Sequence, residues 1–149
     1  MKLSTKCSIA LHCLIFIAEY QNKTKVTSEL LARSTGCNAA AIRGILNPLK
    51  KAGFIYVARG VGGAYLNCNP KELSIWQVYH ALEPNGLNNF IGIHPMPYIG
   101  CPVGYNIRAV LKEPYNQIGN AMKSAMQTIT LDQLLQSFSN IISCEKSGL

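Results

Sequence analysis

The sequence predicts a mainly α-helical protein with one small β-hairpin, and three observations lead to this fold class. Between residues 27 and 66, two short helical patterns meet at Gly36 and precede two β-prone stretches around the glycine-rich tip RGVGGAY. Positive charge is concentrated in the same half of the chain, and a long helical pattern follows residue 101. This order predicts a winged helix-turn-helix whose wing is the hairpin, followed by a long C-terminal dimerisation helix.

The charge is divided unevenly along the 149 residues. Residues 1–66 hold nine Lys/Arg and two Glu, a net charge of +7, whereas residues 67–149 hold five residues of each sign. A basic lobe joined to a neutral one is expected where one part neutralises phosphates and the other has a separate task. A merely solvated basic surface would not favour one half so strongly. The expected partner is therefore double-stranded DNA.

The sequence also indicates the cellular compartment in which the protein is found. No apolar run reaches the ~20 residues that a membrane-spanning helix needs, and the N-terminus lacks the pattern of a secretory signal. We therefore expect a cytoplasmic protein without a membrane partner. The six cysteines are scattered through a chain that is 48% hydrophobic, which indicates reduced thiols rather than a disulfide framework.

The first helix is expected after Ser4, which can cap it. Its inner face is predicted from apolar residues at spacings of three and four, namely Ile9, Cys13, Phe16, Ile17 and Tyr20. The second helix, residues 28–35, is expected to stop at Gly36, because glycine can adopt the left-handed conformation of a tight turn. Asn38 then caps the third helix.

The third helix is the expected recognition helix. Its inner stripe is Ile42, Ile45, Leu46 and Leu49, which leaves Asn38, Ala39, Ala40, Arg43 and Asn47 outside. Arg43 can contact guanine with two hydrogen bonds, and the small Ala39 and Ala40 permit close approach to the major groove. The alternative is that Arg43 meets only phosphate or solvent.

Pro48 predicts a bend or early fraying near residues 44–48. Lys50 and Lys51 can reach phosphate at the helix end.

The hairpin is predicted from residues 54–58 and 64–67, which flank the glycines. Gly60, Gly62 and Gly63 permit positive φ at the tip, and Arg59 is available for a minor-groove or phosphate contact. No helix follows the glycines and no Lys-Ser/Thr pair ends them, so a nucleotide-binding loop is not indicated.

The remaining sequence predicts three helices and a loop. Ser74 caps a short helix, a loop covers residues 83–100, and a long helix starts at Cys101 or Val103. The apolar stripe of this long helix consists of Val103, Ile107, Leu111, Ile118, Met122 and Ala125. Either self-association or the chain's own N-terminal lobe would cover it. Pro114 predicts a kink. Thr130 and Gln133 form a capping box for the last helix. The expected units are residues 1–82 for DNA binding, 83–100 for sensing and 101–149 for dimerisation.

The string NAAAIRGIL followed by KKAGFIYVARGVGGAYL resembles the corresponding segment of the Rrf-type transcription regulators, whose members include IscR, NsrR and CymR. The resemblance covers almost the whole chain and is most specific from Lys51 to Gly63. It implies a homodimeric winged-helix DNA-binding protein, usually a repressor, with a sensing site before the long helix. The residues expected to contact DNA are Thr27, Ser28, Asn38, Ala39, Ala40, Arg43, Asn47, Lys50, Lys51, Arg59 and Gly60.

The loop before the long helix indicates which kind of signal the protein senses. Members of the family with an iron-sulfur cluster place three cysteines there, whereas here only Cys101 stands in such a position, together with His94. The resemblance is therefore to the cluster-less branch, and no cofactor or metal is expected. Cys101 lies at a predicted helix N-terminus, where a thiolate is favoured, so it is a candidate redox sensor. Cys37 lies at another helix start, and we hypothesise a disulfide between Cys37 and the partner's Cys101.

Three alternatives remain open. One is a response to a small molecule without thiol chemistry. Another is a winged helix that only binds protein, against which the charge of residues 1–66 argues. An enzyme that uses Cys101 and His94 lacks an acid or a third orienting residue nearby, so no catalytic residues are expected.

Overall fold

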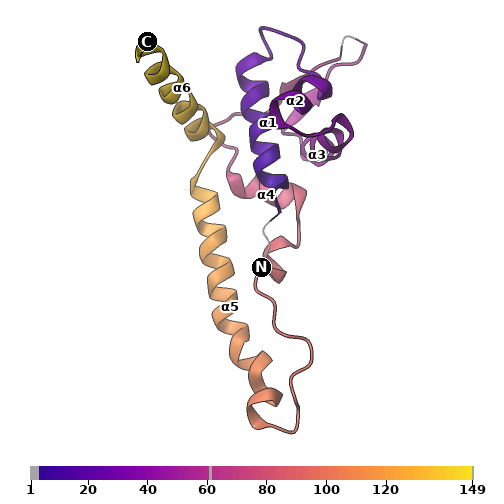
Figure 1. Ribbon diagram of the computed structural model, residues 1–149, viewed down its shortest axis with the longest axis vertical. Helices are drawn as coiled ribbons and strands as arrows, with labels where there is room; N and C mark the ends of the chain where they lie inside the picture. Colours follow the sequence, from indigo (N-terminus) through magenta and orange to yellow (C-terminus); the bar gives the residue numbers. More distant parts are fainter. Residues whose placement is uncertain (1–3, 61, 149) are drawn as a thin grey trace.

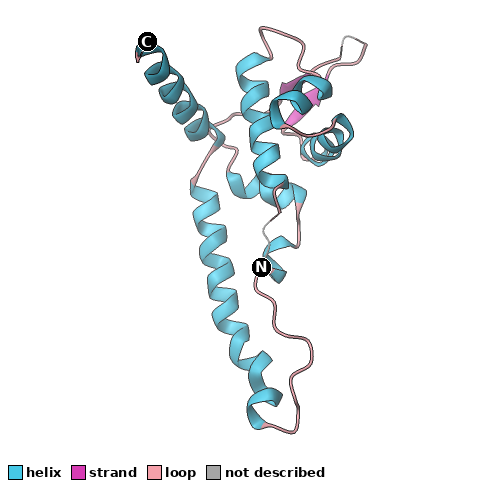
Figure 2. Ribbon diagram, in the orientation of Figure 1, coloured by secondary structure: helices cyan, strands magenta, loops and turns pink. Residues whose placement is uncertain are grey.

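The computed structural model describes residues 4–60 and 62–148, and it divides them into a helical lobe with a hairpin and two long helices that extend from that lobe (Figure 1). The lobe contains α1 (Lys6–Tyr20), α2 (Ser28–Thr35), α3 (Ala39–Lys51), β1 (Ile55–Val57), β2 (Ala64–Leu66) and α4 (Ile75–Leu82). A short 3-10 turn, η1 (Gly86–Asn89), precedes α5 (Pro102–Thr128) and α6 (Leu131–Ser147). Figure 2 shows how little of the molecule is strand. The predicted fold class is thus confirmed.

The first helix confirms part of the expected inner face, because Cys13 and Ile17 are fully buried and Ile9 and Phe16 pack against the core. Ala10 and Leu14 are fully buried with Cys13, whereas Tyr20 is 39% exposed and stacks on Phe16 with ring centroids 4.6 Å apart. The helix is apolar on nearly every side, so spacing alone could not fix which stripe meets the core. The Ser4 hydroxyl accepts a hydrogen bond from the Lys6 amide at 3.2 Å, although Thr5 is the residue that directly precedes the helix.

The helix-turn-helix follows its sequence signals closely. The Thr27 hydroxyl accepts from the Leu30 amide at 3.2 Å, Gly36 takes φ +72°, and the Asn38 side chain accepts from the Ala41 amide at 2.8 Å. The four residues of the expected inner stripe of α3 are all buried. The expected fraying near Pro48 is not found, because α3 continues through the proline to Lys51.

The hairpin pairs Ile55 with Leu66, Tyr56 with Tyr65 and Val57 with Ala64 in antiparallel register. It is joined to the lobe by the Ala64 amide, which donates to the Val26 carbonyl at 2.8 Å. The glycines at the tip adopt the expected positive φ: Gly60 +77°, Gly62 +68° and Gly63 +97°. The wing is therefore held against the connection between α1 and α2.

Backbone hydrogen bonds join the C-terminal helices to the lobe at the junction between α5 and α6. The Ile75 amide donates to the Ile129 carbonyl at 2.9 Å, and the Leu131 amide donates to the Leu73 carbonyl at 2.8 Å. Leu73 and Leu131 are both buried. The capping box predicted at the start of α6 is present, and Ser74, the predicted cap of α4, forms a capping box with Gln77 as well. These bonds fix the end of α5 beside the start of α4.

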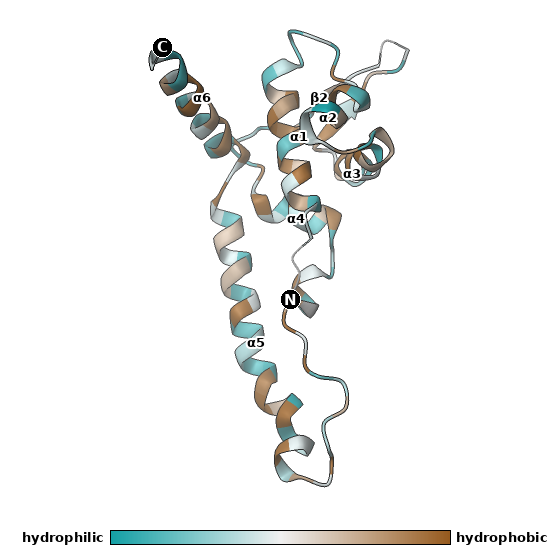
Figure 3. Ribbon diagram, viewed as in Figure 1, coloured by the Kyte–Doolittle hydropathy of each residue, from teal (hydrophilic) through white to brown (hydrophobic). Residues whose placement is uncertain are grey.

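Helix α5 projects away from the lobe. None of its described side chains is buried, and Val103 and Ile118 are 68% and 42% exposed. Its contacts within the chain are chiefly with α4 and η1. Packing of its apolar stripe in the chain's own core, one of the two alternatives, is therefore wrong. Figure 3 shows apolar segments along α5, and Figure 1 shows a change in its direction in the N-terminal half, which contains Pro114.

Candidate nucleic-acid interface

A groove of ≈ 500 Å³ lies on the lobe, between the start of α2, the outer side of α3 and the hairpin. The lobe groove contains three cations and one anion. Its described lining residues are Lys25, Val26, Thr27, Ser28, Glu29, Arg43, Leu46, Asn47, Lys50, Val57, Gly62, Gly63 and Ala64. A concave surface with an excess of positive charge attracts phosphate.

The structure brings five of the eleven expected DNA contacts together in this groove. They are Thr27, Ser28, Arg43, Asn47 and Lys50. The other six do not line it: Asn38, Ala39 and Ala40 form the start of α3, Lys51 ends that helix, and Arg59 and Gly60 belong to the wing tip. Among the first group of three, Asn38 and Ala40 are exposed, whereas Ala39 is half-buried against the core.

Arg43 has a partner that the sequence did not reveal. Its Nη2 donates to Oε1 of Glu29 at 2.8 Å, and both side chains are more than half exposed. Ser28 donates to the other carboxylate oxygen at 3.3 Å. The pKa of Glu29 lies below its usual value, chiefly because its own backbone amide bonds to the carboxylate and further because Arg43 is adjacent. Glu29 is thus an anion at the mouth of a cationic groove.

Lys25 is the second residue that sequence reasoning missed. A Cβ atom placed on Gly62 would lie 2.8 Å from Lys25 Cε, so the lysine stem runs directly along the wing glycines. An added Cβ would therefore displace the flexible end of the lysine side chain. The one signal in the sequence was a lysine two positions before the cap Thr27, which is too weak a pattern to predict the contact.

The two candidate redox cysteines differ in environment. Cys101 directly precedes α5, and the backbone amides of Gly104 and Val103 lower the pKa of its thiol, as the expected helix start would do. Cys37 is half-buried against the core, with its sulfur 3.9 Å from the Thr35 carbonyl. All six cysteines are free thiols in the single chain. Burial raises the pKa of Cys13 to about 12, in agreement with its expected packing role.

A recognition helix set in a helix-turn-helix beside a cationic groove and a hairpin defines a winged-helix DNA-binding protein. A family model described as Rrf2, iron-dependent transcriptional regulator, matches residues 3–137. The chain belongs to the Rrf2 family, which consists of transcriptional regulators and not of enzymes. The resemblance noted in the sequence is thereby confirmed.

Similar proteins agree with this assignment. YwnA of Bacillus subtilis, named as an HTH-type transcriptional regulator, is 28% identical over 133 residues, which are 89% of this chain and 96% of YwnA. A solved structure described as a DNA-binding protein is 28% identical, has a TM-score of 0.69 and aligns over 87% of this chain and 98% of its own.

Two further solved structures share the fold at lower identity. A regulator from Lactobacillus plantarum is 20% identical with a TM-score of 0.76, covering 99% of this chain and 100% of its own. CymR, the global cysteine regulator of B. subtilis, is 20% identical with a TM-score of 0.67, covering 91% of this chain and 97% of its own.

The iron in the family description has no matching donor set among the residues that the structure describes. Within residues 4–60 and 62–148 no three His, Cys, Asp or Glu side chains gather into a possible metal site. Cys101 has no second thiol in the preceding loop. The described residues of one chain therefore do not fit an iron-sulfur cluster. In the same part of the chain, no helix combines the length and apolar character needed to cross a bilayer.

Proposed function

We propose that this protein is a sequence-specific repressor that acts in the cytoplasm as a homodimer on a palindromic operator. The observation that carries the proposal is the groove in which Lys25, Arg43 and Lys50 gather beside the recognition helix. Each protomer would place α3 in the major groove, and the two half-sites would lie about one helical turn apart, roughly 34–36 Å. The lysines would neutralise phosphates along the groove and the wing.

The exposed stripe of α5 supports the dimer. A 27-residue helix with no buried side chain, on which Val103, Val110 and Ile118 are exposed, presents more apolar surface than a monomer ordinarily leaves in water. A second copy of the same helix would cover it. The two DNA-binding lobes would then be fixed at a distance that the α5 pair determines.

The test is a titration with duplexes from the DNA upstream of the protein's own coding sequence, at two salt concentrations. Several phosphate contacts predict a steep loss of affinity with salt, together with a preference over scrambled duplex. Absence of specific binding under both reducing and oxidising conditions would contradict a DNA-reading role. A winged helix that only binds protein would give that result.

Redox control through Cys101 is the finer part of the proposal. Its lowered pKa increases the thiolate fraction, which is the form that oxidants attack. Oxidation would join Cys101 to the partner's Cys37 and tilt α3. A Cys101→Ser protein whose DNA affinity still responds to peroxide would remove Cys101 as the sensor. Mass spectrometry of oxidised protein without a Cys37 cross-link would remove the pair.

A further inference from the structure

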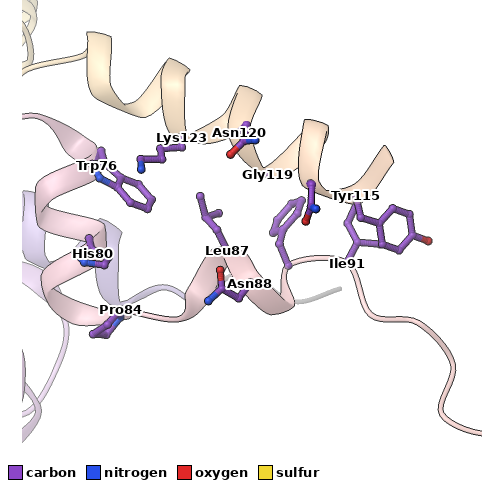
Figure 4. Close-up of a pocket in the computed structure, with 12 residues that line it drawn as sticks. Trp76, His80, Pro84, Leu87, Asn88, Ile91, Tyr115, Gly119, Asn120 and Lys123 are labelled. Carbon is purple, nitrogen blue, oxygen red and sulfur yellow. The ribbon is translucent and has the colours of Figure 1, made fainter. Parts of the chain in front are cut away.

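The pocket beside α5 is separate from the groove on the lobe. It lies between α4, η1 and the middle of α5 (Figure 4). Its volume of ≈ 310 Å³ is at the lower end of the range of ~300–1,000 Å³ for small-molecule sites. Its lining residues are Trp76, His80, Pro84, Leu87, Asn88, Phe90, Ile91, Tyr115, Asn116, Gly119, Asn120 and Lys123. The space therefore suits one small metabolite.

The chemistry of this α4–α5 pocket favours an anion with a flat body. None of its described lining residues is acidic, and no carboxylate among the described residues lies within 4 Å of the Lys123 ammonium group. Lys123 lies 5.1 Å from the centre of the Trp76 ring, which in turn stacks on His80 at 5.2 Å. A flat ligand can lie against such rings while its anionic group reaches the lysine.

The pocket occupies a different face of α5 from the dimer stripe. Tyr115, Gly119 and Lys123 are four residues apart and share the face toward α4. Ile118, in the exposed stripe, is rotated by about 100° from its neighbour Gly119 on a regular helix. Dimerisation through the stripe therefore leaves the pocket on its own side of α5.

Helix α4 connects the pocket to the DNA-binding lobe. Trp76 and His80 face the pocket, whereas Val78 and Tyr79 of the same helix are buried in the lobe. The helix packs against α1 and α3 as well as α5. A ligand held by both α4 and Lys123 would thus fix the angle between the DNA-binding lobe and the dimer helix.

We propose that the α4–α5 pocket binds a small planar carboxylate and that occupancy changes the affinity for DNA. Trp76 and His80 supply the stacking surface, Lys123 pairs with the carboxylate, and Asn116 and Asn120 offer amide hydrogen bonds. Binding of the carboxylate stands on the pocket alone, whereas its effect on DNA rests on the proposed repressor function.

The sole tryptophan of the chain, Trp76, makes the binding directly observable. The probes are benzoate and phenylacetate, with the neutral benzamide and phenylacetamide as matched controls, titrated into the full-length protein. The tryptophan fluorescence should change with the concentration of each acid and saturate in the millimolar range or below. Each amide should bind at least tenfold more weakly, because it cannot form the ion pair with Lys123. Calorimetry on the same samples checks that the fluorescence change reports binding.

Two variants test the site itself. Lys123→Met should weaken binding of the acids at least tenfold and leave binding of the amides unchanged. Gly119→Leu should abolish binding by filling the pocket, whereas Gly119→Ala should retain it, because its Cβ would only reach ordinary contact, 3.9 Å from the Leu87 carbonyl. Circular dichroism confirms that each variant is folded. Equal binding of acids and amides, no saturable response, or full binding by Gly119→Leu would overturn the site.

The regulatory step has its own readout. Operator affinity, measured with and without saturating benzoate, should change at least threefold in the wild type and not in Gly119→Leu. Saturable binding with unchanged DNA affinity would overturn the regulation and leave the site intact. Specific ligand binding by a protein that binds no DNA would show that the proposed function, and not the pocket, had failed.

Discussion

The guanidinium of Arg43 on the recognition helix donates to the carboxylate of Glu29 on α2 across 2.8 Å. The two residues are fourteen positions apart and are joined only because the helix-turn-helix folds the start of α2 against the outer side of α3. Both side chains are largely exposed, so the pair adds little to folding stability. We propose that the pair matters for DNA recognition, because it restrains the one arginine on α3 and places an anion beside it.

Glu29→Gln should therefore raise the affinity for DNA of any sequence and reduce the preference for the operator. The carboxylate repels phosphates and orients Arg43, and the amide does neither with comparable strength. Fluorescence anisotropy with operator and scrambled duplexes measures both affinities. Glu72→Gln, a change of the same kind at an exposed position outside the groove, is the control. An unchanged ratio of the two affinities in Glu29→Gln would show that Glu29 does not orient a base-reading arginine.

Arg43→Ala and Lys50→Ala should separate base reading from phosphate binding. Arg43→Ala should cost about 1–3 kcal/mol on the operator and relax the preference at one base position. Lys50→Ala should weaken all sequences alike and reduce the salt slope by about one. Lys51→Ala serves as the neighbouring comparison, because Lys51 lies outside the groove that Lys50 lines, and its effect should be smaller. If Arg43→Ala also weakened every sequence equally, Arg43 would be a phosphate contact.

The start and the buried face of the recognition helix were predictable because several independent signals agree on them. A cap at Asn38, a left-handed glycine at Gly36 and one apolar stripe fix where α3 begins and which face it buries. The same reasoning succeeded only in part for α1, whose sequence is apolar on nearly all sides. Cys13 and Ile17 are buried as expected, but Tyr20 was placed inward although it is exposed. The contact between Glu29 and Arg43 depends on tertiary packing, and no spacing rule reports it.

Gly44→Ala and Gly62→Ala should have opposite effects on stability. Gly44 lies in α3 with open space where a Cβ would go, so alanine should stabilise the protein by about 0.5–1 kcal/mol. Gly62 has φ +68° and its Cβ would meet Lys25, so alanine should destabilise by at least about 1–2 kcal/mol. Urea unfolding of the two variants measures both changes. A Gly62→Ala protein as stable as the wild type would contradict the left-handed backbone conformation of Gly62.

Ile118→Glu should convert a dimer to a folded monomer. The substitution puts a charge in the middle of the exposed stripe of α5, and no described side chain of α5 is buried within one chain. Sedimentation equilibrium gives the mass, and circular dichroism checks the helix content. Ser124→Glu, an exposed position roughly 120° away on the same helix, should remain dimeric. A wild type that sediments as a monomer at all concentrations would contradict the dimer.

The pH dependence of Cys101 alkylation should reveal its lowered pKa. The thiolate is the reactive form, and amides at the start of α5 stabilise it, so the rate of reaction with iodoacetamide should reach its midpoint at a pH below the ordinary value of about 8.5. Rising pH increases the rate through that midpoint and then leaves it constant. Because the folded-state pKa is the lower one, the thiolate stabilises the fold above the ordinary pKa, and this contribution is lost as pH falls through the folded value.

Unfolding in urea supplies the control for this measurement. It removes the helix start, so the midpoint for Cys101 should return to that of an ordinary thiol. Cys13, buried and with its pKa raised to about 12, should react only after unfolding. Peptide mapping after brief alkylation distinguishes the two sites. A Cys101 midpoint that is the same in folded and unfolded protein would show that the amides of Val103 and Gly104 do not activate the thiol, and the redox proposal would lose its chemical basis.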